Sequence, residues 1–449
     1  MDKVIKRIED AVNKYRRGII DVAEFMWDNP ECGYREWRAT KYLEEKYEAL
    51  GYKLVCAGNI PGFYTVIDTG RPGPEILVLG ELDALSCPGH FHADPQTGMA
   101  HACGHNAQSA ALYGIAAALT EDGMLDGLSG RIRLCAVPAE EIGELEFREE
   151  LKKEGVITYF AGKAEFMHRG FFNGVDMAIL VHTQSASYYS VDGGAVGLLS
   201  KRATFKGVSA HAGTSPSEGR NALYAATQGL SAINALRETF RDDDHIRVHP
   251  IITEGGGAVN TIPDRVTLES YVRGLTVEAI ADANRRINRA LAGAAVSLGV
   301  ELEISDTLSA APMTDSPKLA EVAGEAIKMM LPDAEYHFFN KPMTGSTDMG
   351  DVSAIMPTVH AYIPGVEGKG HGIDYRIADH DIACLMSAKW QIAMLHILLS
   401  DGARRAYDVL DGFTPRFASA KELLDFKMEL SREGDRVFYS DGGEITVKV

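Results

Sequence analysis

The chain has 449 residues, 45% of them hydrophobic, so it can bury a sizeable core, and its length favours two domains. Its formal net charge of -18 argues against nucleic acid or an anionic membrane surface as a partner, because both attract basic patches. The six cysteines show no paired spacing, the first residues are charged, and no run approaches about 18 apolar residues, so we expect a soluble cytoplasmic protein.

The first part of the chain alternates helical and strand patterns. The predicted order is helix 3–28, helix 36–50, strand 53–57 and strand 62–68. Residues 75–80 then form a compact apolar run, which is typical of a parallel strand covered on both faces. This run leads directly into Glu81-Leu-Asp83, and an acidic residue at the end of a buried strand is a first indication of a site.

The residues His101-Ala-Cys103-Gly-His105-Asn106 place one thiol and two imidazoles before a helical pattern of small residues that begins near Ala107. Three side chains of the kind that bind metals at one loop-to-helix junction suggest a site. Taken alone, they are explained equally well by a turn with a buried cysteine and two solvated histidines.

Two later strand patterns also end in polar side chains. Residues 131–137 lead to Glu140 and Glu141, and residues 175–181 lead to His182. Strands separated by helical segments indicate a parallel α/β sheet, in which ligands bind at the carboxyl ends of the strands. We therefore expect one cluster at that edge, made of Asp83, Cys103, His105, Glu140, Glu141 and His182. By themselves, the two glutamates would suit a solvated acidic turn, and the histidine would suit a packed side chain.

Thiolate, imidazole and carboxylate ligands together suit zinc, manganese or a similar divalent ion. Two adjacent glutamates after a strand point to different sides, so one can bind a metal while the other handles a proton. This division fits metal-assisted hydrolysis, in which the ions lower the pKa of a bound water and polarise a carbonyl.

From Tyr189 the pattern changes to a βαββαβ order, which is the ferredoxin-like split unit. The predicted elements are strand 196–207, helix 219–240, strands 246–257 and 262–275, helix 276–298 and strand 299–305. We therefore expect an α/β metal-binding domain with a mostly parallel sheet, made of residues 1–187 and 309–449. The inserted ferredoxin-like domain would span residues 188–308.

The α/β pattern resumes after Ser309. The predicted elements are helix 316–330, a polar glycine-rich loop at 344–353, strand 358–363, a loop with His371 and helix 379–399. His371 adds another histidine after a strand. The sequence shows no nucleotide-binding motif, and residues from 401 onward have no assigned role.

Seven motifs, in this order, resemble the amidohydrolase branch of the aminoacylase and carboxypeptidase-type dinuclear metallopeptidases. They are Gly80-Glu-Leu-Asp83, His101-Ala-Cys103-Gly-His105-Asn106, Pro138-Ala-Glu140-Glu141, His182, Ser209-Ala-His211-Ala-Gly213, Asn260-Thr-Ile-Pro-Asp264 and His371. Within the branch, residues 345–353 and Asn106 resemble the aminobenzoyl-glutamate hydrolase and Xaa-Arg dipeptidase subgroup.

The resemblance implies two divalent metal ions, Zn or Mn, and a role for each matching residue. The implied metal ligands are Cys103, His105, Glu141, His182 and His371. Glu140 matches the general base, and Asp83 matches a residue that orients a ligand.

The inserted domain matches a lid that also forms a homodimer. His211 matches a histidine that reaches the partner subunit's active site and stabilises the oxyanion, while Asn260 and Arg273 match positions that meet the substrate. Without the resemblance, these three residues suit a turn on the inserted domain, a β-turn and a surface strand.

Asn106 departs from most of the branch, which has aspartate there. An amide cannot supply charge to the ions, so if Asn106 lies near the metals, the site carries one negative charge fewer.

We therefore expect metal-dependent hydrolysis of the amide bond of a small N-acyl amino acid or dipeptide-like substrate. A thiol hydrolase with Cys103 as nucleophile is an alternative, although it leaves Glu140, Glu141, His182 and His371 without a role. A non-catalytic binding protein on the same fold is another, and it predicts a lost ligand or base, none of which is missing here.

Overall fold

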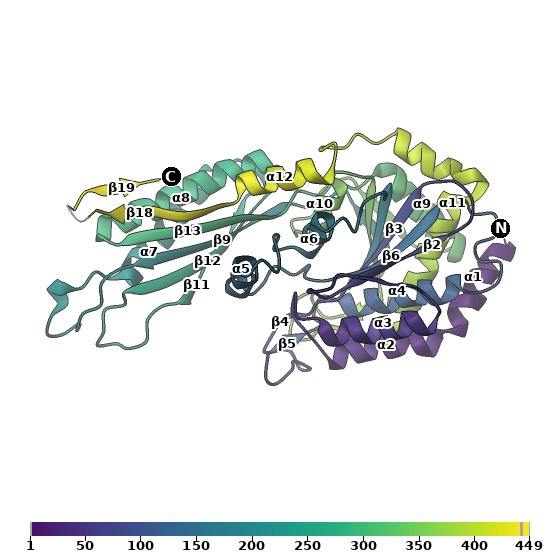
Figure 1. Ribbon diagram of the computed structural model, residues 1–449, viewed down its shortest axis with the longest axis horizontal. Coiled ribbons are helices and arrows are strands. Elements are labelled where there is room, and N and C mark those ends of the chain that lie inside the picture. The colour runs from purple at the N-terminus through teal and green to yellow at the C-terminus, as the bar shows by residue number, and fades with distance from the viewer. Residues whose placement is uncertain (1, 441–442, 449) are drawn as a thin grey trace. The chain divides into compact units, whose positions relative to one another are not determined.

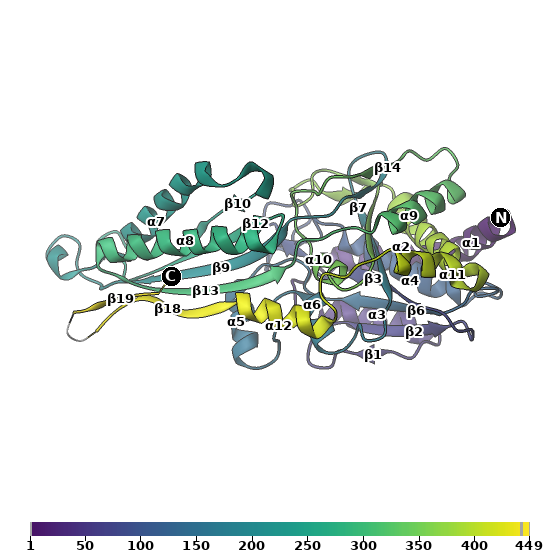
Figure 2. The same cartoon turned by 90° about the horizontal axis from the view of Figure 1, so that it is seen from above.

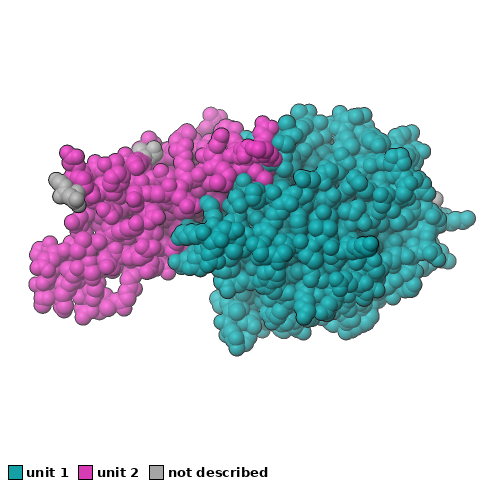
Figure 3. Space-filling view, viewed as in Figure 1, with its two compact units in different colours: residues 1–194, 313–343, 348–420 teal, residues 195–312, 344–347, 421–449 magenta. Residues whose placement is uncertain are grey.

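The structure, a computed structural model, describes residues 2–440 and 443–448 and divides into two units (Figure 3). Unit 1 comprises residues 1–194, 313–343 and 348–420. Unit 2 comprises residues 195–312, 344–347 and 421–449. Unit 2 thus contains residues 195–308 of the expected inserted segment 188–308, whereas residues 188–194 belong to unit 1. Unlike the expected division, unit 2 also contains two later pieces of chain.

An eight-stranded sheet with the order β1-β2-β6-β3-β7-β15-β8-β14 forms the centre of unit 1 (Figure 1). The strands are β1 Val55–Cys56, β2 Phe63–Asp68, β3 Glu75–Glu81, β6 Arg131–Val137, β7 Met177–Thr183, β8 Tyr189–Asp192, β14 Tyr336–Phe339 and β15 Thr358–Ile363. The four central strands β6, β3, β7 and β15 are parallel, whereas the β1–β2, β2–β6 and β15–β8 pairs are antiparallel.

The α/β fold is therefore confirmed, and the sheet is mixed, because the β14–β8 pair is parallel as well and the three antiparallel pairs stand beside four parallel ones. Connections as short as residues 69–74, between β2 and β3, leave no room for the crossover that parallel strands need. Two short hairpins lie outside this sheet. They are β4 Leu85–Ser86 with β5 Met99–Ala100, and β16 Val366–Glu367 with β17 Arg376–Ile377.

Helix α4, His105–Leu119, is the central helix of unit 1 and is buried over its whole length. It contacts β3, β6 and β7 of the sheet, as well as α1, α2 and α11 (Figure 1). A Cβ at Gly114 would lie 2.9 Å from Ile19 Cδ1 and 3.1 Å from Ala388 Cβ, so a larger residue there would force these side chains on the neighbouring helices to shift. The other helices of unit 1 are α1 Asp2–Lys14, α2 Arg16–Asp28, α3 Trp37–Ala49, α5 Leu145–Lys153, α6 Gly162–His168, α9 Pro317–Met330, α10 Met349–Ser353 and α11 Ser387–Asp411.

Residues Asp381–Asp411 form one helical stretch that is long and apolar enough to cross a membrane by length and composition. Of its most apolar window, 72% is buried within the protein, which is the behaviour of a core helix. The backbone of Ser400–Ala403 is not helical, so the helical run is interrupted near its predicted end at residue 399.

Unit 2 contains an antiparallel sheet with the order β10-β12-β9-β13-β18-β19, and β11 pairs with β12. Its elements are β9 Gly197–Lys206, α7 Ala222–Leu236, β10 Arg247–Val248, β11 Ile251–Glu254, β12 Arg265–Gly274, α8 Val277–Leu298 and β13 Glu301–Ala310. Helices α7 and α8 pack against each other and against β9 and β12 (Figure 2). The element order agrees with the expected βαββαβ unit, whose role as a lid stays a prediction.

The C-terminal residues extend this sheet. They form α12 Ala420–Leu430, β18 Arg432–Tyr439 and β19 Ile445–Val447. Strand β18 pairs antiparallel with β13, with Leu302 opposite Val437, and the buried Lys427 Nζ donates to Ser309 O at 2.9 Å. These contacts explain why residues 421–449 belong to unit 2 and not, as expected, to the metal-binding domain.

We predict that Asp306→Ala lowers the free energy of unfolding of unit 2 by about 3–5 kcal/mol, because it leaves an ammonium group buried without its counter-charge. Asp306 binds the fully buried Lys201, and Asn284 Nδ2 donates to Asp306 Oδ2 at 2.8 Å. Urea denaturation measures the change. As a control on the same strand, Glu303→Ala removes an exposed partner of Lys206 and should cost at most about 1 kcal/mol. Equal effects of the two substitutions would contradict this prediction.

Candidate metal centre

The predicted ligands come together at one edge of the unit 1 sheet. Glu140 and Glu141 follow β6, Asp83 follows β3, and His182 is the second-last residue of β7. Since β6, β3 and β7 are parallel neighbours, their carboxyl ends lie side by side. Cys103 and His105 come from the start of α4, and His371 comes from the β16–β17 hairpin loop.

Cys103 lies at the centre of two groups of ligand atoms. One group contains Cys103, His105 and His182, and the other contains Cys103, Glu141 and His371; within each group the ligand atoms lie within 4.8 Å of one another. Cys103 Sγ lies 3.4 Å from His182 Nε2, and His371 Nε2 lies 3.0 Å from Glu141 Oε1. These residues would hold divalent ions, and Cys103 could serve either group.

Asp83 holds two of these ligands in place. Its carbonyl oxygen lies 2.8 Å from His105 Nδ1, and its Oδ1 lies 3.2 Å from the same nitrogen. Its Oδ2 accepts a hydrogen bond of 2.8 Å from the backbone N–H of Glu141. Asp83 therefore orients the His105 ring so that Nε2 faces the other ligands, as carboxylates beside metal-binding histidines do.

The loop that carries the two glutamates is held by residues that the sequence did not indicate. Ala139 has a left-handed backbone (φ 58°), and its N–H donates to the fully buried Glu36 Oε1 at 2.8 Å. The buried Arg148 donates from Nε to Gly143 O at 2.8 Å and also binds the carbonyl of Glu141. A cation and a carboxylate thus fix the backbone on both sides of Glu140.

The electrostatics of the site favour a thiolate. Burial and the Glu141 carboxylate would raise the pKa of Cys103, but the His105 and His182 imidazoles outweigh them and lower it to about 6. Burial raises the pKa of Glu140 well above its ordinary value, and the nearby carboxylates of Glu81 and Glu141 add to this effect.

The donor atoms fit divalent metal ions. Within the described part of the chain, the buried atoms His105 Nε2 and Glu141 Oε1 make no hydrogen bond of normal geometry. Buried polar atoms are rarely left in this state, and a bound cation would satisfy both. The thiolate, imidazole and carboxylate set is one that zinc, manganese and similar ions accept.

Asn106 does not face this cluster. The side chain is buried, and its amide donates to the carbonyl of Ala23 on α2 at a distance of 3.5 Å. The residue next to the His105 ring is instead Glu81, whose Oε2 lies 3.1 Å from His105 Nε2. The amide of Asn106 thus binds α2 rather than a candidate ligand.

The three predicted residues of the inserted domain lie in unit 2. His211 and Asn260 are neighbours there, because His211 pairs with Thr261 in an antiparallel bridge and Ala212 N donates to Asn260 O at 2.9 Å. Arg273 lies near the opposite end of β12, roughly 26 Å from Arg265 at the rise of a β-strand. Unit 2 therefore does not bring Arg273 together with His211 and Asn260.

A model of peptidase family M20/M25/M40 matches residues 77–389, which is more than half of the chain. The chain belongs to this family. The predicted resemblance and the predicted class of enzyme, a hydrolase of the peptidase type, are thereby confirmed.

The relatives of this chain include an aminobenzoyl-glutamate hydrolase and an Xaa-Arg dipeptidase, the two kinds of enzyme in the expected subgroup. The chain is 28% identical to one of the subunits of the p-aminobenzoyl-glutamate hydrolase of Escherichia coli over 313 residues, which are 68% of this chain and 60% of that protein. It is 26% identical to the Xaa-Arg dipeptidase of Mus musculus over 393 residues, or 83% and 82% of the two chains. A Bacillus subtilis structure described as a dinuclear metal binding peptidase from the M20 family matches 86% of this chain and 99% of that one, with a TM-score of 0.62 and 19% identity.

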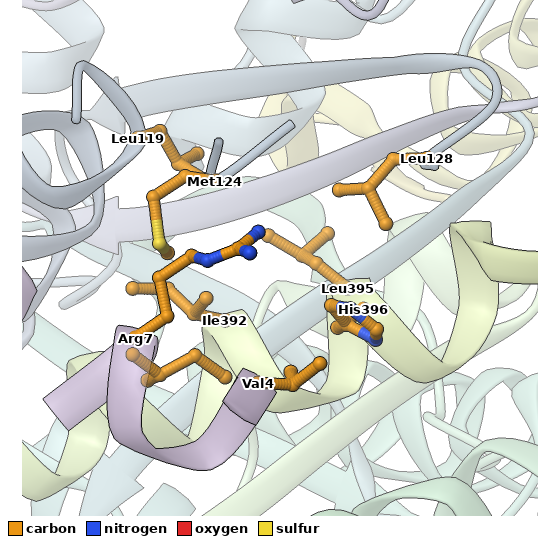
Figure 4. Close-up of a pocket in the computed structure, with 9 residues that line it drawn as sticks. Val4, Arg7, Leu119, Met124, Leu128, Ile392, Leu395 and His396 are labelled. Carbon is orange, nitrogen blue, oxygen red and sulfur yellow. The ribbon is translucent and has the colours of Figure 1, made fainter. Parts of the chain in front are cut away.

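A small cavity elsewhere in unit 1 is not part of this site (Figure 4). It lies at the C-terminal end of α4, where Leu119, Arg7 of α1 and Leu395 of α11 line it. Its volume of about 10 Å³ holds at most one water molecule. Because His105 begins the 15-residue helix α4, the cavity lies roughly 20 Å from the candidate ligands.

In metal-free protein of this M20 family member, we predict that iodoacetamide alkylates Cys103 with an apparent pKa of about 6. The thiolate is the reactive form, so the rate should rise from pH 5 to 7 and then level off. Mass spectrometry of the labelled peptide gives the rate. Cys56 is an exposed control, because burial and hydrogen bonding to Glu44 raise its pKa to about 11, and its labelling should increase only at alkaline pH. Zinc should protect Cys103 alone, and a Cys103 rate that parallels Cys56 would contradict the prediction.

Proposed function

We propose that this M20 family chain hydrolyses the amide bond of a small N-acyl amino acid or a dipeptide-like substrate. The observation that carries this proposal is the pair of ligand groups that share Cys103, with Glu140 beside them but in neither group. The names of the relatives support the substrate class, since they act on aminobenzoyl-glutamate and on Xaa-Arg dipeptides.

Two divalent ions, Zn or Mn, held by Cys103, His105, Glu141, His182 and His371 would lower the pKa of a water molecule and polarise the substrate carbonyl. Glu140 would take the proton of that water as general base and return it to the leaving amine. The raised pKa of Glu140 supports this role, because a carboxylate with a raised pKa is a stronger base for the proton of the water.

For the oxyanion, we propose His211 of a second copy of the chain in a homodimer. The Nδ1 of His211 accepts hydrogen bonds of 3.1 Å from the N–H groups of Gly213 and Thr214. This pattern favours the tautomer with the proton on Nε2, which is then free to donate. Asn260 would meet the substrate beside His211. The role of Arg273 in substrate binding is proposed only from the resemblance. The cytoplasmic location of the protein also stays a prediction.

A thiol hydrolase is the second candidate, and two observations favour it. The lowered pKa of Cys103 and its distance of 3.4 Å from His182 Nε2 are also features of a cysteine–histidine nucleophile pair. The two mechanisms differ in their need for metal.

The proposed function is tested by a substrate screen on metal-free protein reconstituted with zinc or with manganese. The panel contains aminobenzoyl-glutamate, N-acyl amino acids and basic dipeptides, and amine release is measured. We expect cleavage of at least one class only after metal is added. No cleavage of any compound with either metal would overturn the proposal.

A further inference from the structure

A buried ammonium group lies beneath the candidate metal centre. Lys163 belongs to α6, and its side chain is fully buried. Its Nζ donates to Glu81 Oε1 at 2.6 Å and also binds Asp348 Oδ1, while its backbone N–H donates to Asp348 Oδ2 at 3.0 Å. Burial would lower the pKa of Lys163, but Asp348 and Glu81 outweigh it and raise the pKa, so the group stays charged.

Glu81 connects this ammonium to the candidate ligands. Its Oε2 accepts a hydrogen bond of 2.8 Å from Gln108 Nε2 and lies 3.1 Å from His105 Nε2. Both carboxylate oxygens of Glu81 therefore accept hydrogen bonds, Oε1 from Lys163 and Oε2 from Gln108. Oε2 also lies beside His105 Nε2, which is a candidate metal ligand.

His105 belongs to two groups that compete for the same ion. One is its group with Cys103 and His182, and the other contains Glu81, His105 and Glu140, again with ligand atoms within 4.8 Å of one another. An ion in the second group would use Glu140 as a ligand and so remove the general base. The oxygen of Glu81 that faces His105 is Oε2, which already accepts a hydrogen bond from Gln108 Nε2. Lys163 binds the other oxygen, Oε1, and its positive charge offsets the carboxylate charge that would attract an ion, so Glu81 is a poor ligand.

We propose that Lys163, anchored by Asp348, is a positioning residue that keeps Glu81 out of metal coordination. His105 then serves the centre at Cys103, and Glu140 remains free to move protons. The inference rests on the proposed function and adds to it a role for Lys163, Glu81 and Asp348. It also gives a role to the polar loop at 344–353, which contains Asp348.

The chain offers a matched control for the loss of a buried ammonium group. Lys201 in unit 2 is also fully buried and binds Asp306 and Asn288, but none of the candidate ligand groups contains its partners. Lys201→Met should therefore cost stability without changing the metal centre.

The test uses the full chain loaded with cobalt(II), which accepts the same ligands as zinc and whose absorption reports on thiolate coordination. In Lys163→Met we expect the cobalt content to stay unchanged. The absorption band that arises from thiolate coordination of cobalt should fall by about half, because one ion leaves the sulfur. The kcat should fall about 10- to 100-fold. In Lys163→Met with Glu81→Gln, no carboxylate is free to compete, so the band should return to its wild-type intensity.

Three results would overturn the inference: an unchanged band in Lys163→Met, a band that stays low in the double variant, or an equal loss in Lys201→Met. If Lys163→Met does not fold, Asp348→Asn replaces it, and a smaller decrease of the thiolate-to-cobalt band is expected. A band of wild-type intensity in Asp348→Asn would also contradict the inference. A wild-type protein that shows no thiolate band at all contradicts the proposed function instead.

Discussion

Replacing Glu140 with glutamine should lower kcat by about 100- to 10,000-fold, the usual contribution of a positioned general base. The amide keeps the shape of the side chain but cannot accept the proton of the attacking water. Because Glu140 is in neither of the two groups that share Cys103, the variant should retain the metal content of the wild type. Steady-state kinetics and elemental analysis of the same preparation measure both quantities.

Glu141→Gln serves as the contrasting variant, because Glu141 belongs to one of the two groups. It should lose about one ion per chain along with activity, since its ligand oxygen loses its charge. Full activity of Glu140→Gln on every substrate that the wild type cleaves would exclude Glu140 as the base.

Removal of metal should abolish hydrolysis entirely. Dialysis against a chelator should reduce activity to background, and addition of zinc or manganese should restore it, because both ligand groups then lose their cation. A thiol hydrolase would remain active without metal, since Cys103 and His182 would suffice. Amide cleavage before and after chelation therefore separates the two mechanisms.

Cys103→Ala provides a second comparison for the same question. Under the metal mechanism it weakens both ion sites at once, because Cys103 belongs to both groups, and excess metal should recover part of the activity. Under the thiol mechanism no amount of metal restores activity. Metal-independent cleavage by the wild type would refute the dinuclear mechanism.

The ligand-type residues were predictable because each follows a recognisable local pattern. Asp83 and the pair Glu140-Glu141 follow apolar runs, and Cys103 and His105 precede a long small-residue helix. Parallel strands place their carboxyl ends at one edge, so Asp83, Glu140 and Glu141 were expected to gather there. His182 needed a small adjustment, since it lies within β7 rather than after it.

The neighbours of these residues were not predictable. Lys163 lies 82 residues from Glu81 and 185 residues from Asp348, and a lysine in a short helix carries no periodic signal of burial. Arg148 and Glu36 hold the Glu140 loop through backbone carbonyls and N–H groups, which leave no mark in the sequence. The direction of the Asn106 side chain also depends on the packing of α4 against α2.

The sequence by itself thus determined the α/β class and the set of side chains that meet at the sheet edge, because strand and helix periodicity is local. The resemblance to the family rested on the seven ordered motifs. Only the tertiary structure decided the antiparallel edges of the sheet, the place of residues 421–449 beside β13, and the buried contact of Lys163 with Glu81 and Asp348. These features depend on which distant segments pack together. A buried charge is tolerated only beside a group of opposite charge, and here that group comes from a distant part of the chain.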